Sequence, residues 1–287
     1  MQTVFSIAID ALAYGMVLFV ISIGLSVTMG LMRVVNLAHG AFAMIGGYIA
    51  SYVARDLGMG YAAAVIAAVV ITIAIAIPIE RLLYRRIYGQ PELTQVLMTI
   101  GITFCIIGIA NYVMGPTLKT IPLAGPLQGS ADLGFRAISI HRLFAIICGL
   151  VVALGLWFVI EKTSFGVKLR ASVDNAAMAA ALGVRTEFVY AVSFAVAVGL
   201  AAFGGVVGAE LLPVEPYYAL RYMVTFLVVV SVGGAGSIPG ALIACLVLGA
   251  IDTTGRYMMP EFGEFFFYLA VIAIICVFPR GFAGRVR

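Results

Sequence analysis

Residues 61–79 read YAAAVIAAVVITIAIAIPI, an apolar run without a charged residue. A helix needs about 20 apolar residues to cross the hydrocarbon core of a bilayer. Backbone polar groups cannot stay unpaired in lipid, so such runs fold as helices despite their strand-like Ala, Val and Ile content. Comparable runs occur at 5–29, 37–53, 93–114, 143–160, 188–210, 217–232, 238–254 and 265–279. The sequence therefore predicts an all-α, polytopic transmembrane bundle of about eight to nine segments, including broken or half helices.

The composition of the 287 residues points the same way, because 63% are hydrophobic and only 10% are charged. Soluble domains average about 45–50% apolar and about 25% charged residues. No stretch between the apolar runs is long enough for a separate catalytic domain, so we expect a single transmembrane domain over residues 1–287. The net charge of +4 indicates basic membrane-protein loops rather than binding to nucleic acid.

Residue types that catalyse reactions or bind metals are sparse. The two histidines, His39 and His141, are far apart, and the four cysteines lie in apolar stretches without metal-ligand spacing. No phosphate-binding loop with its lysine and no G-x-S-x-G motif occurs. We therefore expect no catalytic residue, no cofactor and no metal, and we expect any ATP hydrolysis to reside in another chain.

Acidic residues in a membrane segment are candidates for function by default. Four occur here, at Asp10, Glu80, Glu210 and Asp252. The last three fall at segment ends, where water and lipid headgroups reach them, so the sequence favours anchoring at the interface. No acid falls near the middle of a segment, which argues against a proton-coupled carrier.

The basic residues set the expected orientation, since cytoplasmic loops of membrane proteins are enriched in Lys and Arg. Nine crossings, with the N-terminus outside and the C-terminus inside, place the richest loops in the cytoplasm. These loops carry Arg33, Arg81, Arg85, Arg86, Lys162, Lys168, Arg170, Arg185, Arg280, Arg285 and Arg287. The first segment is expected to be retained, because a cleavable signal needs a basic start. The segment 217–232 is short for a full span, and the longest loop, 115–142, would lie outside as a docking element or a loose connector.

Two stretches interrupt the helical pattern: MRVVNLAHGAFAMIGGY (32–48) and VGGAGSIPG (232–240). HGAFAMIGGYI (39–49) and PGALIACLVLGAI (239–251), which overlap these breaks, loosely resemble each other, through an internal repeat or by chance between Ala/Gly-rich segments. Paired broken segments mark the substrate pathway in many transporters. One interpretation is that these breaks line the translocation pathway. The other is structural, with Asn36 as the N-cap of a helix and the glycines allowing close helix packing. The candidate pathway residues are Asn36, His39, Gly40, Gly233, Gly234 and Gly236.

Residues 169–184, LRASVDNAAMAAALGV, are too polar to insert in lipid and lie between two spans. Alanine favours helix, Asp174 or Ser172 can cap its start, and Gly183 can end it. Lys162, Lys168 and Arg170 provide a basic approach. The small-residue face suits docking to a cytoplasmic partner better than resting on the membrane, because alanine is only weakly hydrophobic.

Three stretches together, MRVVNLAHGAFAMIGGY, TSFGVKLRASVDNAAMAAALGV and VVVSVGGAGSIPGALIACLVLGAID, resemble the branched-chain amino acid ABC permeases of the LivH type. The likeness runs from about Leu12 to Pro279. It implies a membrane subunit of a bacterial importer in the cytoplasmic (inner) membrane. The implied partners are a second, LivM-type permease subunit, two cytoplasmic ATP-binding subunits and an external or periplasmic solute-binding protein.

The resemblance also implies that 165–184 is the coupling helix that enters a cleft in an ATPase. The residues that match the family's pattern there are Phe165, Gly166, Arg170, Asn175, Leu182 and Gly183. The glutamate that precedes the two alanines in the general importer motif is missing, because Asn175 stands before Ala176 and Ala177. The implied cargo is a branched-chain amino acid. Urea or amides, aromatic acids, and a secondary transporter working alone are the alternatives.

Overall fold

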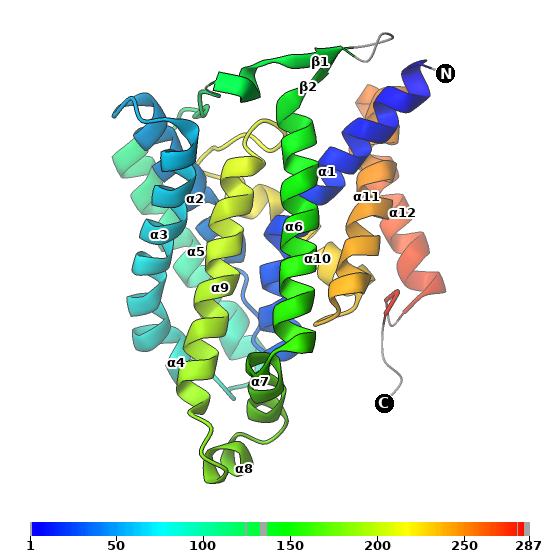
Figure 1. Cartoon of the computed structure of the whole chain (residues 1–287). Coiled ribbons are helices and arrows are strands. Elements are labelled where there is room, and N and C mark those ends of the chain that lie inside the picture. Colours follow the sequence, from blue (N-terminus) through cyan, green and yellow to red (C-terminus); the bar gives the residue numbers. More distant parts are fainter. Residues whose placement is uncertain (1, 124, 133–136, 280, 284–287) are drawn as a thin grey trace.

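The computed structural model describes residues 2–123, 125–132, 137–279 and 281–283, which form a bundle of helices (Figure 1). Within these residues, nine helices of 15 to 25 residues take the places of the nine apolar runs. They are α1 (Gln2–Ser26), α2 (His39–Arg55), α3 (Tyr61–Ile79), α5 (Glu92–Met114), α6 (Ile140–Lys162), α9 (Thr186–Val207), α10 (Tyr218–Gly233), α11 (Ile238–Met258) and α12 (Gly263–Val277). The predicted polytopic helical bundle is confirmed.

Six helical stretches are long and apolar enough to cross a membrane, by length and composition, in the described part of the chain. They are Phe5–Leu31, Tyr61–Ile87, Glu92–Met114, Ile140–Lys162, Thr186–Val207 and Ile238–Met258. Helices α2, α10 and α12 are shorter, at 17, 16 and 15 residues. The chain is therefore a multi-pass membrane protein, and the count of nine crossings stays a prediction.

Two of the long stretches continue past their expected ends through π-helical turns. Val27–Leu31 extends α1, and Glu80–Tyr84 joins α3 to the short α4 (Arg85–Ile87). The second extension begins just after Pro78, which lies inside α3. Proline removes one N–H from the helical ladder, and a wider turn accommodates the change. The sequence gives no sign of either extension.

Small residues bring the central helices together. Helix α1 packs against α11, α9 and α6, while α2 packs between α3 and α9. A Cβ at Gly204 or Gly208 of the α9 region would come within 2.5 Å of Ile21 or Val17 on α1. Their four-residue spacing is the small-xxx-small pattern typical of closely packed membrane helices. The internal repeat remains a prediction.

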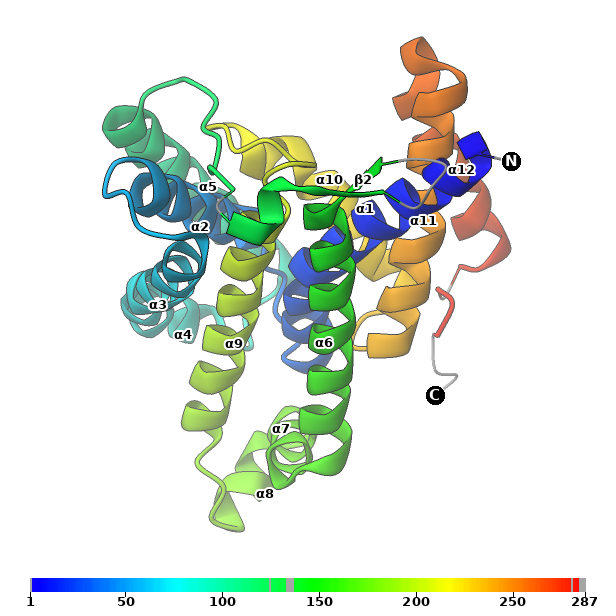
Figure 2. The same cartoon turned by 45° about the horizontal axis from the view of Figure 1, so that its top comes forward.

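Two structures outside the spans mark opposite ends of the bundle (Figures 1 and 2). At one end a hairpin of β1 (Ser130–Asp132) and β2 (Ala137–Ser139) belongs to the 115–142 loop. Elsewhere in this loop Lys119 bridges to Val214, and Thr120 accepts a hydrogen bond of 3.0 Å from Ser51, so its described part is tied to the bundle. At the other end lie α7 (Ser164–Asp174) and α8 (Ala176–Ala181), joined to α6 and α9.

The expected single helix at 165–184 is wrong, because the structure divides it at Asn175. The side of the membrane on which each end lies stays a prediction. Helix α1 begins at the hairpin end, and the chain after α12 returns to the α10–α11 turn, where Phe282 N–H donates to Val232 O at 2.7 Å. The basic tail residues Arg280, Arg285 and Arg287 lie outside the described residues.

Candidate functional site

The corner between α6 and α7 is built by three of the residues singled out in the sequence. A Cβ at Gly166 would overlap the carbonyl oxygen of Ile160, so only glycine permits this approach. The Arg170 guanidinium donates to the same oxygen at 3.0 Å and lies 3.7 Å from a carboxylate oxygen of Glu161. Phe165 packs against the main hydrophobic core. Together these contacts fix the angle at which α7 leaves α6.

The short helix α8 is capped at both ends. Asn175 is its N-cap, with its side-chain oxygen accepting the Met178 N–H at 2.9 Å. Gly183, at φ +84°, ends the helix in the left-handed conformation that glycine adopts easily. The expected caps Ser172 and Asp174 are wrong. Ser172 is buried inside α7, where its hydroxyl donates to Lys168 O at 2.7 Å and its own carbonyl accepts from Tyr190 OH at 2.9 Å.

Helix α8 exposes a small apolar surface at the end of the bundle. Leu182 is 78% exposed and Met178 is 59% exposed. The other exposed members of this α8 surface are Ala176, Ala177, Ala180, Ala181 and Gly183. Exposed apolar patches with a polar rim often mark interaction sites. Lys168 and Arg185, which precede and follow α8 in the sequence, are also exposed.

The break before α2 lies deep in the bundle. Asn36 and His39 are each 1% exposed, and their side chains contact different partners. Asn36 Oδ1 accepts from Tyr84 OH at 2.7 Å and from Ala38 N–H at 3.1 Å, whereas His39 Nε2 lies 2.7 Å from Ile21 O on α1. Helix α2 begins at His39 with Ala38 as its N-cap. The expectation that Asn36 is the N-cap is therefore wrong.

Both polar side chains at this break keep one nitrogen without a hydrogen-bond partner among the described residues, Asn36 Nδ2 and His39 Nδ1. A buried polar group without a partner costs about 1–3 kcal/mol. Gly40 lies against Ala219 and Phe226 of α10, with 3.3–3.4 Å from the position of a Cβ. The break is therefore closely packed but incompletely satisfied.

The second break forms the tight turn between α10 and α11. Gly234 and Gly236 have φ of +87° and +81°, and Gly233 approaches the backbone of Ala241 too closely for a side chain. Gly236 N–H donates to Ser26 Oγ at 3.1 Å on α1. The α10–α11 turn thus meets the end of α1, whereas His39 contacts α1 at Ile21, so the two breaks touch different parts of that helix.

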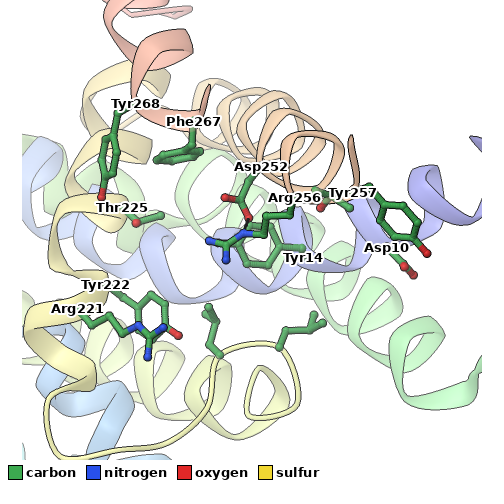
Figure 3. A pocket seen from close by; sticks show the side chains of 13 residues that line it. Asp10, Tyr14, Arg221, Tyr222, Thr225, Asp252, Arg256, Tyr257, Phe267 and Tyr268 are labelled. Atoms are coloured by element: carbon green, nitrogen blue, oxygen red, sulfur yellow. Dashed lines mark hydrogen bonds and ion pairs between the residues drawn. The ribbon is translucent and has the colours of Figure 1, made fainter. Parts of the chain in front are cut away.

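A cavity of about 510 Å³ lies among α1, α10, α11 and α12 (Figure 3). Its charged and aromatic lining residues are Asp10, Tyr14, Arg221, Tyr222, Asp252, Arg256, Tyr257, Phe267 and Tyr268, and Leu211, Leu212, Thr225 and Thr253 complete it. Asp252 Oδ2 accepts from Arg256 Nε at 2.9 Å, and the Arg221 guanidinium lies 2.8 Å from Glu215 Oε1. The i, i+4 spacing of Asp252 and Arg256 was the only sequence signal.

Interface anchoring does not describe two of the acidic residues. Glu80 and Asp252 are each 4% exposed, and both point to partners within the chain. Tyr88 OH donates to Glu80 Oε1 at 3.0 Å beside a smaller cavity of about 350 Å³ near α4 and the start of α9. Glu210, with its side chain 41% exposed, pairs with His141 Nδ1 at 2.8 Å. Among the described residues no group of three or more His, Cys, Asp or Glu is placed to hold a metal ion.

These features define a polytopic membrane permease: a bundle of apolar helices, broken segments at its centre and an exposed helix pair at one end. Residues 7–275 match the family described as branched-chain amino acid transport system / permease component. The chain belongs to this family.

Curated relatives cover nearly the whole chain. The high-affinity branched-chain amino acid transport system permease protein LivH of Escherichia coli K12 is 28% identical over 92% of this chain and 90% of its own. LivH of Salmonella typhimurium is 27% identical with the same coverage. BraD of Pseudomonas aeruginosa, named for the same kind of system, is 26% identical over 96% of this chain and 94% of its own. No solved structure matches significantly.

Proposed function

We propose that this chain is a membrane subunit of an ATP-driven importer for branched-chain amino acids in the bacterial cytoplasmic membrane. It would work with a LivM-type permease subunit, two cytoplasmic ATP-binding subunits and an external solute-binding protein. The observation that carries the proposal is the α8 surface, a capped and exposed apolar helix held between two long spans. Membership in the permease family supports the class of cargo.

The α7–α8 pair is suited to transmit motion from an ATPase. Gly166 and Arg170 hold α7 to the end of α6, and Tyr190 of α9 holds Ser172. Helix α7 is thus attached to both α6 and α9, and α8 follows it after a single residue, Asn175. Rigid-body movement of this kind is a common way to open and close a transport path. A stand-alone secondary transporter leaves α8 without a role.

We further propose that the break at Asn36–Gly40 and the turn at Gly233–Gly236 border the translocation pathway and rearrange during transport. The unpartnered nitrogens of Asn36 and His39 support this proposal, because a second conformation that supplies partners recovers the free energy they cost here. Both elements contact α1, so α1 would couple their movements.

The test is uptake of L-leucine by the complete importer in proteoliposomes. Uptake should require ATP on the side of α8 and should not respond to a proton gradient. Ala177→Arg places a bulky charge on the exposed α8 surface, so it should reduce uptake at least about tenfold, about 1.4 kcal/mol of lost coupling. The protein should still reach the membrane, and ATP hydrolysis should no longer rise with substrate-loaded binding protein.

Ala171→Arg on α7 is the matched control, because Ala171 is also an exposed alanine at the same end. It should leave uptake within about twofold, below 0.5 kcal/mol. Equal loss in both variants would contradict the assignment of the contact to α8. Leucine uptake driven by a proton gradient in the absence of the ATPases would overturn the importer proposal itself.

A further inference from the structure

The cavity among α1, α10, α11 and α12 lies toward the hairpin end of the bundle. Asp10 in the first half of α1 pairs with Arg142 in the first turn of α6, which begins directly after β2. Arg221 is in the first turn of α10, and Asp252 and Arg256 are in the last turns of α11. The cavity is thus separated from the α8 surface by the length of the bundle.

The volume and lining suit a small organic molecule. Ligand sites in proteins occupy about 300–1,000 Å³ and combine apolar walls with a few polar groups. Here the cavity of about 510 Å³ has Leu211, Leu212 and Phe267 as apolar wall residues, while Tyr14 and Tyr268 add aromatic surface. An aliphatic side chain would find apolar contact on this wall.

The charges that line the cavity balance in number and are divided between its helices. Arg221 lies on α10, and the pair of Asp252 and Arg256 lies on α11 (Figure 3). Asp10 on α1 is already matched by Arg142, and Arg221 by Glu215, from outside the cavity lining. The cavity therefore presents a cation, Arg221, and an anion, Asp252, on different helices, and a zwitterion offers an opposite charge to each.

We propose that this cavity binds a zwitterionic α-amino acid with an aliphatic side chain, with Arg221 receiving its carboxylate and Asp252 its ammonium group. Arginine suits the first role because its planar guanidinium pairs with both carboxylate oxygens. Asp252 suits the second because it is 4% exposed and held by Arg256 through one oxygen. The inference rests on the proposed function for its cargo class, and it assigns the place where cargo first meets the permease.

Binding is tested in the assembled importer without ATP, by protection of a cysteine placed in the cavity. Thr253→Cys puts a thiol among the lining residues, and its reaction with a membrane-impermeant thiol reagent is followed over time. The chain without this substitution measures the background from its four native cysteines. L-Leucine should slow the reaction. Neither 4-methylpentanoate, which lacks the amine, nor 3-methylbutylamine, which lacks the carboxylate, should do so at the same concentration.

Arg221→Gln in the same background should raise the leucine concentration for half-protection about tenfold or more, as expected for loss of a charged hydrogen bond. Arg221→Lys should recover part of the binding. Arg55→Gln is the matched control, because Arg55 is exposed at the hairpin end but does not line the cavity. Asp252→Asn should weaken protection too.

Equal protection by all three compounds, absence of protection by leucine, or no effect of Arg221→Gln would overturn the assigned site. Failure of the proposed function gives a different result, since the unsubstituted importer would then not accumulate leucine with ATP. Normal ATP-driven uptake without cavity protection contradicts the cavity site alone.

Discussion

Glycine and alanine decide how closely α2 and α9 approach. A Cβ at Gly205 would overlap the backbone oxygen of Ala43, and one at Gly46 would lie 2.6 Å from the Cα of Ala202. Gly108, in α5, has no atom within 4 Å of the place of its Cβ. A methyl group at Gly205 must therefore move the backbones of α2 and α9 apart, whereas a methyl group at Gly108 meets no atom.

Alanine substitutions at these glycines should change stability in opposite directions. Gly205→Ala should lower the free energy of unfolding by about 1–3 kcal/mol through overpacking. Gly108→Ala should raise it by about 0.5–1 kcal/mol, because alanine loses less backbone entropy in a helix. Thermal or denaturant unfolding of the purified chain in detergent measures both. Equal effects of the two substitutions would contradict the close approach of α2 and α9.

Single residues also show where sequence reasoning reaches its limit. Gly183 could be predicted as a helix stop, because a local backbone conformation determines its role. The setting of Asn36 could not be predicted, because its partner Tyr84 lies 48 residues away. The cavity could not be predicted either. Arg221 and Asp252 come from different helices, and from the sequence each could equally be an ordinary residue at the membrane interface.

Among the elements, α8 depends most on its end groups. It has only six residues, and short helices are marginal in water because nucleation is costly. Its exposed residues contribute little packing, with Ala179 alone buried at 3% exposure. The Asn175 cap therefore matters more here than a cap does on a long buried span.

Removal of the cap should uncouple transport without unfolding the bundle. Asn175→Ala loses the hydrogen bond to Met178 N–H and should cost about 1 kcal/mol of local helix stability. We expect faster hydrogen exchange at the amides of α8 and lower leucine uptake per ATP. Asn175→Asp keeps an oxygen acceptor and should retain coupling. An unchanged exchange rate in Asn175→Ala would show that the cap does not hold α8.

The helices themselves were predictable, because the length of each apolar run fixes a helix in lipid whatever its local propensity. The division of 165–184 was not. Ser172, Asp174 and Asn175 are all good caps, and the choice falls to Asn175 once Ser172 is buried against Tyr190. The hairpin of β1 and β2 was not predicted either, because the 115–142 loop was expected only as a docking element or a loose connector.

On the scale of the whole molecule, the cavity and the α8 surface lie at opposite ends of the bundle. Helix α1 lines the cavity, and its extension Val27–Leu31 contacts α7. This arrangement fits a protein that receives cargo at one side and mechanical work at the other. Basic residues predicted the sidedness from the loops alone, and the structure separates the hairpin from α7–α8 as that prediction requires.

Sidedness can be measured with single cysteines and a membrane-impermeant thiol reagent. Leu57, between α2 and α3, is 53% exposed, and Ala177 on α8 is also exposed. Leu57→Cys should react in intact cells, whereas Ala177→Cys should react only in inverted membrane vesicles, because α8 must face the ATPases. The four native cysteines lie in α5, α6, α11 and α12, so the unsubstituted chain should react little from either side. Reaction of Ala177→Cys in intact cells would place α8 outside the cell, where no ATPase can reach it, and the coupling role would have to be abandoned.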